Sequence, residues 1–116
     1  MTGQAVTLDL VFHALADPHR RGMVERLSLG RASVKELARP IGIALPSVLK
    51  HLKVLEAGGI VVSEKIGRVR TYEIQPDALN AIEEWTAARK RNWNVAFDRL
   101  AQAMADHPEN QESPAP

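Results

Sequence analysis

Apolar side chains recur every three to four residues through the first half of the chain, a pattern that predicts amphipathic helices. Short polar residues stand where two of these helices would begin: Asp17, followed by Pro18, and Ser33, followed by Glu36. Such residues accept backbone N–H groups at a helix start. The predicted helices cover residues 8–16, 18–29, 34–41 and 45–57.

The pattern then changes to two β-branched segments, residues 60–66 and 69–74, which Gly67 and Arg68 separate. This arrangement predicts an antiparallel β-hairpin. Two helices joined by a tight turn and followed by such a hairpin form a winged helix-turn-helix. The predicted fold is therefore mainly α with a small β-hairpin, in the order α-α-α-α-β-β-α.

A final helical pattern runs from Pro76 to about Ala105. At 1.5 Å per residue this helix is roughly 45 Å long, longer than the domain that it would pack against. Part of its apolar stripe therefore needs a second chain to cover it. We predict a two-fold homodimer. Its expected interface combines the first and last helices through Leu8, Val11, Phe12, Trp85, Trp93, Phe97 and Leu100.

The chain length of 116 residues fits one domain, expected over residues 1–105, and the polar, proline-rich residues 106–116 are expected to be disordered. No apolar run approaches the roughly 18 residues of a membrane span, and the first residues lack the pattern of a signal peptide. We therefore expect a cytoplasmic protein without membrane contact. The chain has no cysteine, which excludes disulfides and thiolate metal sites.

Charge is concentrated in one part of the chain. The formal net charge is only +1, yet residues 31–70 hold eight Lys and Arg against three acidic residues, a net charge of +5. This location matches the predicted helix-turn-helix and hairpin. The distribution favours an anionic partner for that region.

The fourth helix offers a face for such a partner. With Val48, Leu52 and Leu55 turned to the core, helical geometry at about 100° per residue predicts an outward group formed by Pro46, Ser47, Lys50, Lys53 and Val54. Lysine and serine can reach base edges or phosphates in a major groove, and valine can touch a thymine methyl group. His51 lies about 60° from the core direction, which leaves open a bond within the fold or a phosphate contact.

Three cations, Lys65, Arg68 and Arg70, surround the glycine of the predicted hairpin. A solubilising turn would explain them, but they also suit the DNA backbone or minor groove beside a helix in the major groove. We interpret them as DNA contacts.

The sequence offers no candidate residues for catalysis or metal binding. His13, His19 and His107 stand in separate segments without the spacing of metal ligands, and no Ser/His/Asp set, phosphate-binding glycine loop or carboxylate pair is evident. The sequence therefore predicts no enzyme, catalytic residue, metal site or cofactor.

Three segments together resemble the ArsR/SmtB family of winged-helix transcriptional repressors: ALADPHRRGMVERL, ASVKELARPIGIALPSVLKHLKVLEAGGIV and KIGRVRTYEI. The likeness covers residues 8 to about 105, and the ending EEWTAARKRNWNVAFDRL is similar to the branch without metal sites. The resemblance implies a dimer held by the first and last helices, with the fourth helix in the major groove and the hairpin on flanking DNA.

The chain departs from the family pattern at three positions. Ala44 stands where a serine often caps the fourth helix, and Leu49 replaces a serine that can reach DNA. Gly59 replaces a usual leucine, which predicts a looser turn before the hairpin and a slightly underfilled core. The departures also put the base preference in question.

The sequence thus predicts a sequence-specific double-stranded DNA-binding regulator, a metal-independent homodimeric repressor that binds an inverted-repeat operator. The promoter of its own gene is one expected site. One alternative is a protein-interaction module that docks a partner through the same basic face. Another is a repressor gated by an unidentified small-molecule effector in the dimer crevice near Trp85 and Trp93.

Overall fold

A computed structural model describes residues 7–107 and confirms the mainly helical winged helix-turn-helix fold. The helices are α1 (Leu8–Leu15), α2 (Pro18–Leu27), α3 (Val34–Ile41), α4 (Leu45–Ala57) and α5 (Pro76–Asp106). The strands are β1 (Ala32–Ser33), β2 (Val61–Ile66) and β3 (Val69–Ile74). The chain divides into two compact units, Met1–Ile82 and Glu83–Pro116.

The helix starts follow the predicted capping chemistry. The Asp17 carboxylate accepts the backbone N–H of Arg20 at the start of α2, where Pro18 takes the first helical position. At the start of α3, the Ser33 hydroxyl accepts the N–H of Glu36 while the Glu36 carboxylate accepts the N–H of Ser33. The reciprocal bonds satisfy two donors that a helix start leaves open.

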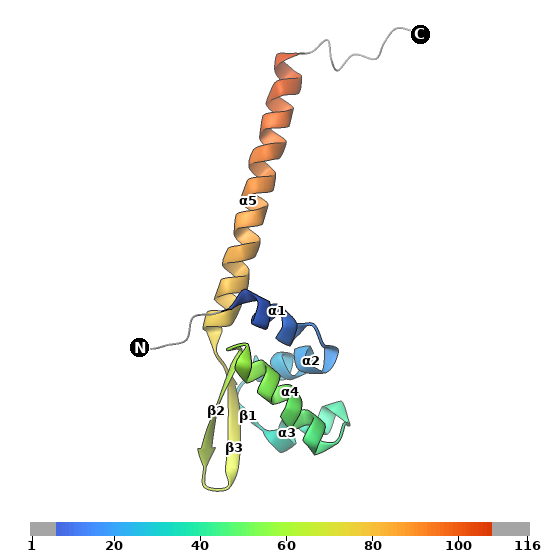
Figure 1. Ribbon diagram of the computed structural model, residues 1–116, viewed down its shortest axis with the longest axis vertical. Coiled ribbons are helices and arrows are strands. Elements are labelled where there is room, and N and C mark those ends of the chain that lie inside the picture. The colour runs from blue at the N-terminus through green and yellow to red at the C-terminus, as the bar shows by residue number, and fades with distance from the viewer. Residues whose placement is uncertain (1–6, 108–116) are drawn as a thin grey trace. The chain divides into compact units, whose positions relative to one another are not determined.

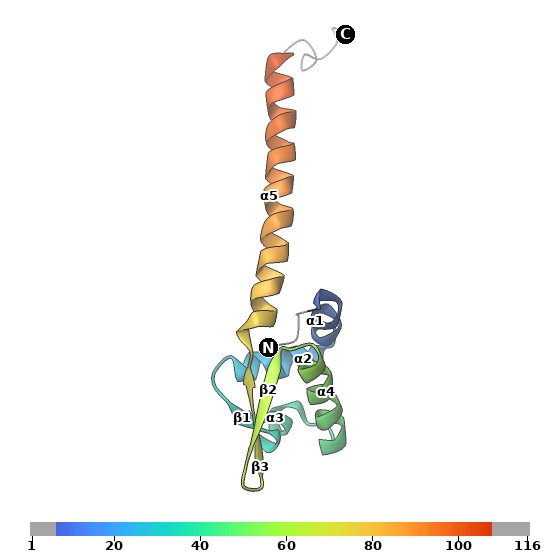
Figure 2. The ribbon, with the colours of Figure 1, turned by 60° about the vertical axis from the view of Figure 1, so that its left-hand side comes forward.

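The first unit contains a three-stranded antiparallel sheet in the order β1-β3-β2. The sequence predicted β2 and β3 but not β1, which has only two residues. Figures 1 and 2 show the β2–β3 hairpin extending past the helices of this unit as a wing. At its tip Gly67 takes φ 63° while Arg68 does not take a positive φ, the pattern of a type II′ hairpin turn.

One hydrophobic core holds the first unit together, with side chains from α1 to α4 and from the sheet. Val48, Leu52 and Leu55 are fully buried, as their spacing along α4 predicts. Val11 is also fully buried, because α1 packs against α2 and α4. Its predicted place in a dimer interface is therefore wrong.

The end of α4 explains Gly59. This residue takes φ 73°, and the N–H groups of Gly59 and Ile60 donate to the carbonyls of Glu56 and Leu55 at 2.9 and 3.0 Å. These bonds form a Schellman motif, in which glycine supplies the left-handed conformation. Ile60 then enters the core with no exposed surface. The predicted loose turn is therefore wrong, and the slightly underfilled core stays a prediction.

The second unit consists of α5 from Glu83 onward. Trp93, Phe97, Leu100 and Met104 recur at intervals of four, three and four residues and are exposed by 68%, 58%, 58% and 46%. Trp85 is exposed by 41%, and the guanidinium of Arg89 lies 5.1 Å from the centre of its ring. Among residues 7–107, no helix is long and apolar enough to cross a membrane. The predicted disordered tail is residues 106–116. Asp106 instead belongs to α5, and residues 108–116 lie outside the described residues.

Candidate nucleic-acid interface

The outward side of α4 presents polar, basic and apolar groups together. Pro46, Ser47, Lys50 and Lys53 are exposed, as the helical geometry predicts. Val54 is half-buried and packs against the core, so it is less exposed than predicted, and its predicted DNA contact stays a prediction. The physical reason is that α4 has four neighbours, α1, α2, α3 and β2, which bury a wider arc of its surface than three core residues indicate.

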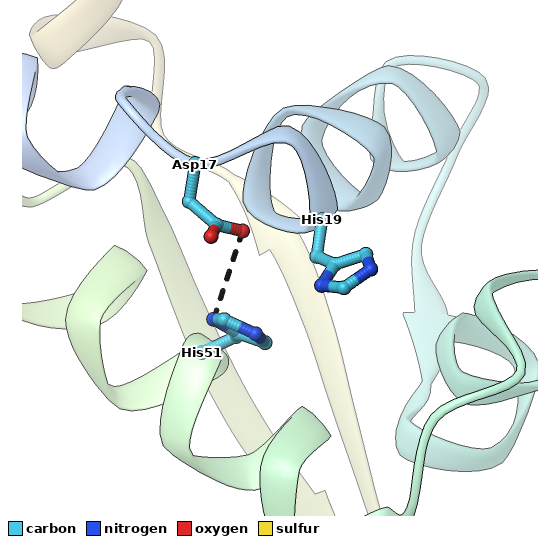
Figure 3. Close-up of side chains that lie close together, drawn as sticks. All are labelled: Asp17, His19 and His51. Atoms are coloured by element: carbon cyan, nitrogen blue, oxygen red, sulfur yellow. Dashed lines mark ion pairs between the residues drawn. The ribbon is translucent and has the colours of Figure 1, made fainter.

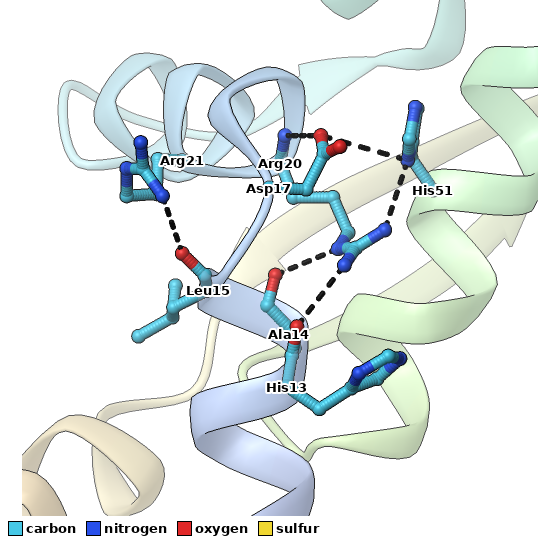
Figure 4. Close-up of polar contacts among 7 residues, drawn as sticks. All are labelled: His13, Ala14, Leu15, Asp17, Arg20, Arg21 and His51. Atoms are coloured by element: carbon cyan, nitrogen blue, oxygen red, sulfur yellow. Dashed lines mark hydrogen bonds and ion pairs between the residues drawn. The ribbon is translucent and has the colours of Figure 1, made fainter.

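His51 bonds within the fold, the first of its two predicted roles. Its Nδ1 atom lies 3.2 Å from a terminal nitrogen of Arg20 and 4.0 Å from the carboxylate of Asp17. Arg20 also donates to the carbonyls of Ala14 at 2.7 Å and His13 at 3.0 Å (Figure 4). One guanidinium group thus joins the end of α1, the start of α2 and the middle of α4.

The charge of Asp17 fits this network. Burial by itself raises the pKa of the Asp17 carboxyl, but the Arg20 N–H and the nearby charges of His51 and Arg20 outweigh that effect. The net result is a pKa below the ordinary value. Asp17 therefore carries a negative charge beside Arg20 at neutral pH.

Asp17, His19 and His51 form a cluster whose possible ligand atoms all lie within 4.8 Å of one another (Figure 3). The two imidazole rings are 5.6 Å apart in an edge-to-face arrangement. Sequence spacing missed this cluster, because His19 lies on α2 and His51 on α4. Arg20 already places a positive charge beside His51 and opposes a second cation there. We assign the cluster a structural role, and the predicted lack of a metal site stays a prediction.

The wing concentrates positive charge. Lys65 and Arg70 are directly opposite in the β2–β3 register, and Arg68 occupies the turn, all three exposed. Like charges opposite each other across two strands destabilise a hairpin. The arrangement is therefore unfavourable for folding and favourable for an anionic partner.

Hydrogen bonds connect this wing to α4. Arg70 donates to the Ser63 hydroxyl at 2.8 Å, and Ser63 donates to the Glu56 carboxylate at 3.2 Å. Glu56 belongs to the last turns of α4. The chain of bonds positions the basic strand relative to the exposed face of the helix.

Two features of this surface escaped the sequence analysis. The position of Arg20 in the sequence gives no sign that its side chain contacts His51 on α4. Leu45 and Leu49 are exposed by 44% and 40% on α4, although only Leu49 had stood out, as a departure from a family serine. Their interval of four residues is the signal that could have placed both leucines on one face of the helix.

A helix-turn-helix domain model matches residues 15–64, which include α2, α3 and α4. The HTH-type transcriptional regulator Rv2034 of Mycobacterium tuberculosis is 40% identical over 96 residues, 83% of this chain and 87% of the relative. A crystal structure of an ArsR family transcriptional regulator, RHA00566, superposes with a TM-score of 0.73 at 46% identity, covering 75% of this chain and 96% of that one. The chain belongs to the ArsR family of transcriptional regulators.

A third relative of this ArsR-family chain is named a repressor. The HTH-type transcriptional repressor SmtB of Mycobacterium tuberculosis is 36% identical over 64 residues, 55% of this chain and 47% of the relative. These relatives are regulators by name, and the family assignment agrees with the resemblance seen in the sequence.

Proposed function

We propose that this ArsR-family regulator binds double-stranded DNA with α4 in the major groove and the wing on the adjacent backbone or minor groove. The observation that carries the proposal is the exposed basic surface of the first unit, above all the opposed pair Lys65 and Arg70. A DNA duplex offers about one negative charge per 1.7 Å of its axis and compensates such a pair. The proposal places the protein in the cytoplasm, where a bacterial-type regulator would meet the chromosome.

The side chains divide into two groups by what they can reach. Pro46, Ser47 and Lys50 lie in the first half of α4, the part of a recognition helix that meets base edges. Lys53 and the wing cations hold phosphates. His51, with 20% of its side chain exposed, acts chiefly by holding α4 through Arg20.

A second copy of the chain completes the binding unit. In the second unit, Trp93, Phe97, Leu100 and Met104 follow the four-three spacing of a helix-helix seam. In the first unit, α1 exposes 41% of Phe12, and Leu8 is half-buried. We propose that the partner copy covers these groups. Two-fold symmetry then gives an inverted-repeat operator with half-sites about one helical turn apart.

Occupation of such an operator blocks RNA polymerase where the two sites overlap. We therefore propose repression, in keeping with the SmtB relative, which is named a repressor. A site in the promoter of its own gene would make the protein autoregulatory. The absence of cysteine directs any search for an inducing signal away from thiol chemistry.

A salt series on the full chain tests the DNA proposal. Fluorescence anisotropy would follow binding to a labelled random duplex between about 50 and 300 mM salt. We expect the logarithm of the binding constant to fall linearly with the logarithm of the salt concentration, because each phosphate contact releases counterions. The absence of binding at the lowest salt contradicts the proposal and favours a protein-interaction module.

A further inference from the structure

The exposed face of α4 contains an apolar row that lies outside the hydrophobic core. Leu45 and Leu49 stand one turn apart and are exposed by 44% and 40%, while Leu52 and Leu55 of the same helix are fully buried. The core side of α4 is therefore filled without the first two leucines. Single exposed leucines are common on protein surfaces. Two neighbouring leucines within a basic face instead indicate a binding surface.

The neighbours of the row indicate the chemistry of its partner. Leu45, Leu49 and Lys53 follow each other at intervals of four residues, so their side chains lie along one ridge of the helix. Lys50 is exposed next to Leu49, and α4 contains no acidic residue before Glu56. A partner of this face has apolar groups set within a negatively charged surface. The major groove of DNA has this character, since thymine methyl groups lie between two phosphate backbones.

We propose that Leu45 and Leu49 read thymine methyl groups in the operator half-site. The inference rests on the proposed function and adds to it the class of base that α4 selects. Leucine has no donor or acceptor, so it cannot bond to the polar groups by which bases differ, and covering such a group costs free energy. The C5-methyl group of thymine is the apolar feature of the major groove, and cytosine lacks it. The half-site is therefore expected to hold thymine opposite each leucine.

Deoxyuridine provides a direct test, because it differs from thymidine by that methyl group alone. An operator is first recovered by selection from a random duplex library. Duplexes carrying it are then compared with duplexes in which one thymine at a time is replaced by uracil. We expect wild-type protein to lose about fourfold in affinity at the contacted positions, the ratio for burying one methyl-sized group. Leu49→Ser should bind the thymine and uracil duplexes equally at one of these positions, and Leu45→Ser at another.

The matched control is Leu29→Ser, which removes a leucine exposed by 84% outside α4. This variant should keep the wild-type preference for thymine. The uracil series on wild-type protein needs no variant, so the inference stays testable if a substitution disturbs folding. Circular dichroism and melting curves show separately whether each variant is folded.

The outcomes separate the inference from the function on which it rests. Specific operator binding that is indifferent to every thymine methyl overturns the leucine proposal and leaves DNA recognition intact. A methyl preference that survives both serine substitutions also overturns it. The absence of specific binding to any duplex overturns both proposals and favours an apolar protein partner for the row.

Discussion

Arg20 connects three helices through one side chain, with hydrogen bonds to the carbonyls of His13 and Ala14 and a contact to His51. The last carbonyls of a helix lack the N–H partners of the helix interior. The His13 carbonyl accepts the N–H of Ala16 at 3.2 Å, and the Arg20 guanidinium adds bonds to the carbonyls of His13 and Ala14. The neighbouring Arg21 makes a single such bond, to the carbonyl of Leu15 at 2.8 Å. The two arginines form a natural comparison.

Arg20→Gln should lower the free energy of unfolding by about 1–3 kcal/mol, the range for losing hydrogen bonds from a charged donor to partly buried groups. The control Arg21→Gln should cost less than about 1 kcal/mol, because its bond is exposed. Urea denaturation at neutral pH measures both values. Equal losses for the two variants would contradict the role given to Arg20.

Ala44 is the residue before α4 and provides no side-chain hydrogen bond to the helix start. Ala44→Ser should stabilise the fold by roughly 1 kcal/mol, because a serine hydroxyl can accept a backbone N–H there. Thermal denaturation measures the change, with Ala57→Ser at the other end of α4 as the control. A melting temperature that rises no more for Ala44→Ser than for the control would count against the missing cap.

Among the elements, those with strong local signals were predicted well. The observed bounds of α4 agree with the prediction. The buried apolar positions mark the length of the helix, and the glycines that follow it mark its end. β1 carries only Ala32 and Ser33, too few residues to show an alternating pattern. The position of Val54 and the Arg20 contacts depend on which helices pack together. Local spacing does not contain that information, so these parts of the site could not be predicted.

The wing and α4 are expected to contribute to binding in different ways. Arg68→Ala should weaken binding to all duplexes and lower the salt slope by about 1, because a phosphate contact carries no sequence information. Lys50→Ala should instead change the ranking among operator variants, by about 1–3 kcal/mol at the base it reads. Anisotropy titrations over a salt series measure both effects.

The control for this pair is Lys90→Ala, an exposed cation of α5. It should leave both the ranking and the slope unchanged. An Arg68→Ala protein with the wild-type salt slope would refute the assignment of the wing to phosphates.

At the scale of the whole molecule, the apolar row of the second unit is expected to determine assembly. Phe97→Glu places a charge within the row of Trp93, Phe97 and Leu100, and should raise the dimer dissociation constant at least about tenfold. Analytical ultracentrifugation measures this constant. Val95→Glu changes an exposed residue outside the row and should leave the dimer intact. If both variants sediment like the wild type, the row does not form the interface.

The central claim is that this ArsR-family protein recognises a DNA sequence as a symmetric dimer. Selection of binding sites from a random duplex library at about 150 mM salt tests it most directly, because non-specific binding is weak under that condition. We predict recovery of an inverted repeat whose half-sites are about one helical turn apart. Recovery of no common motif by folded protein would contradict the claim.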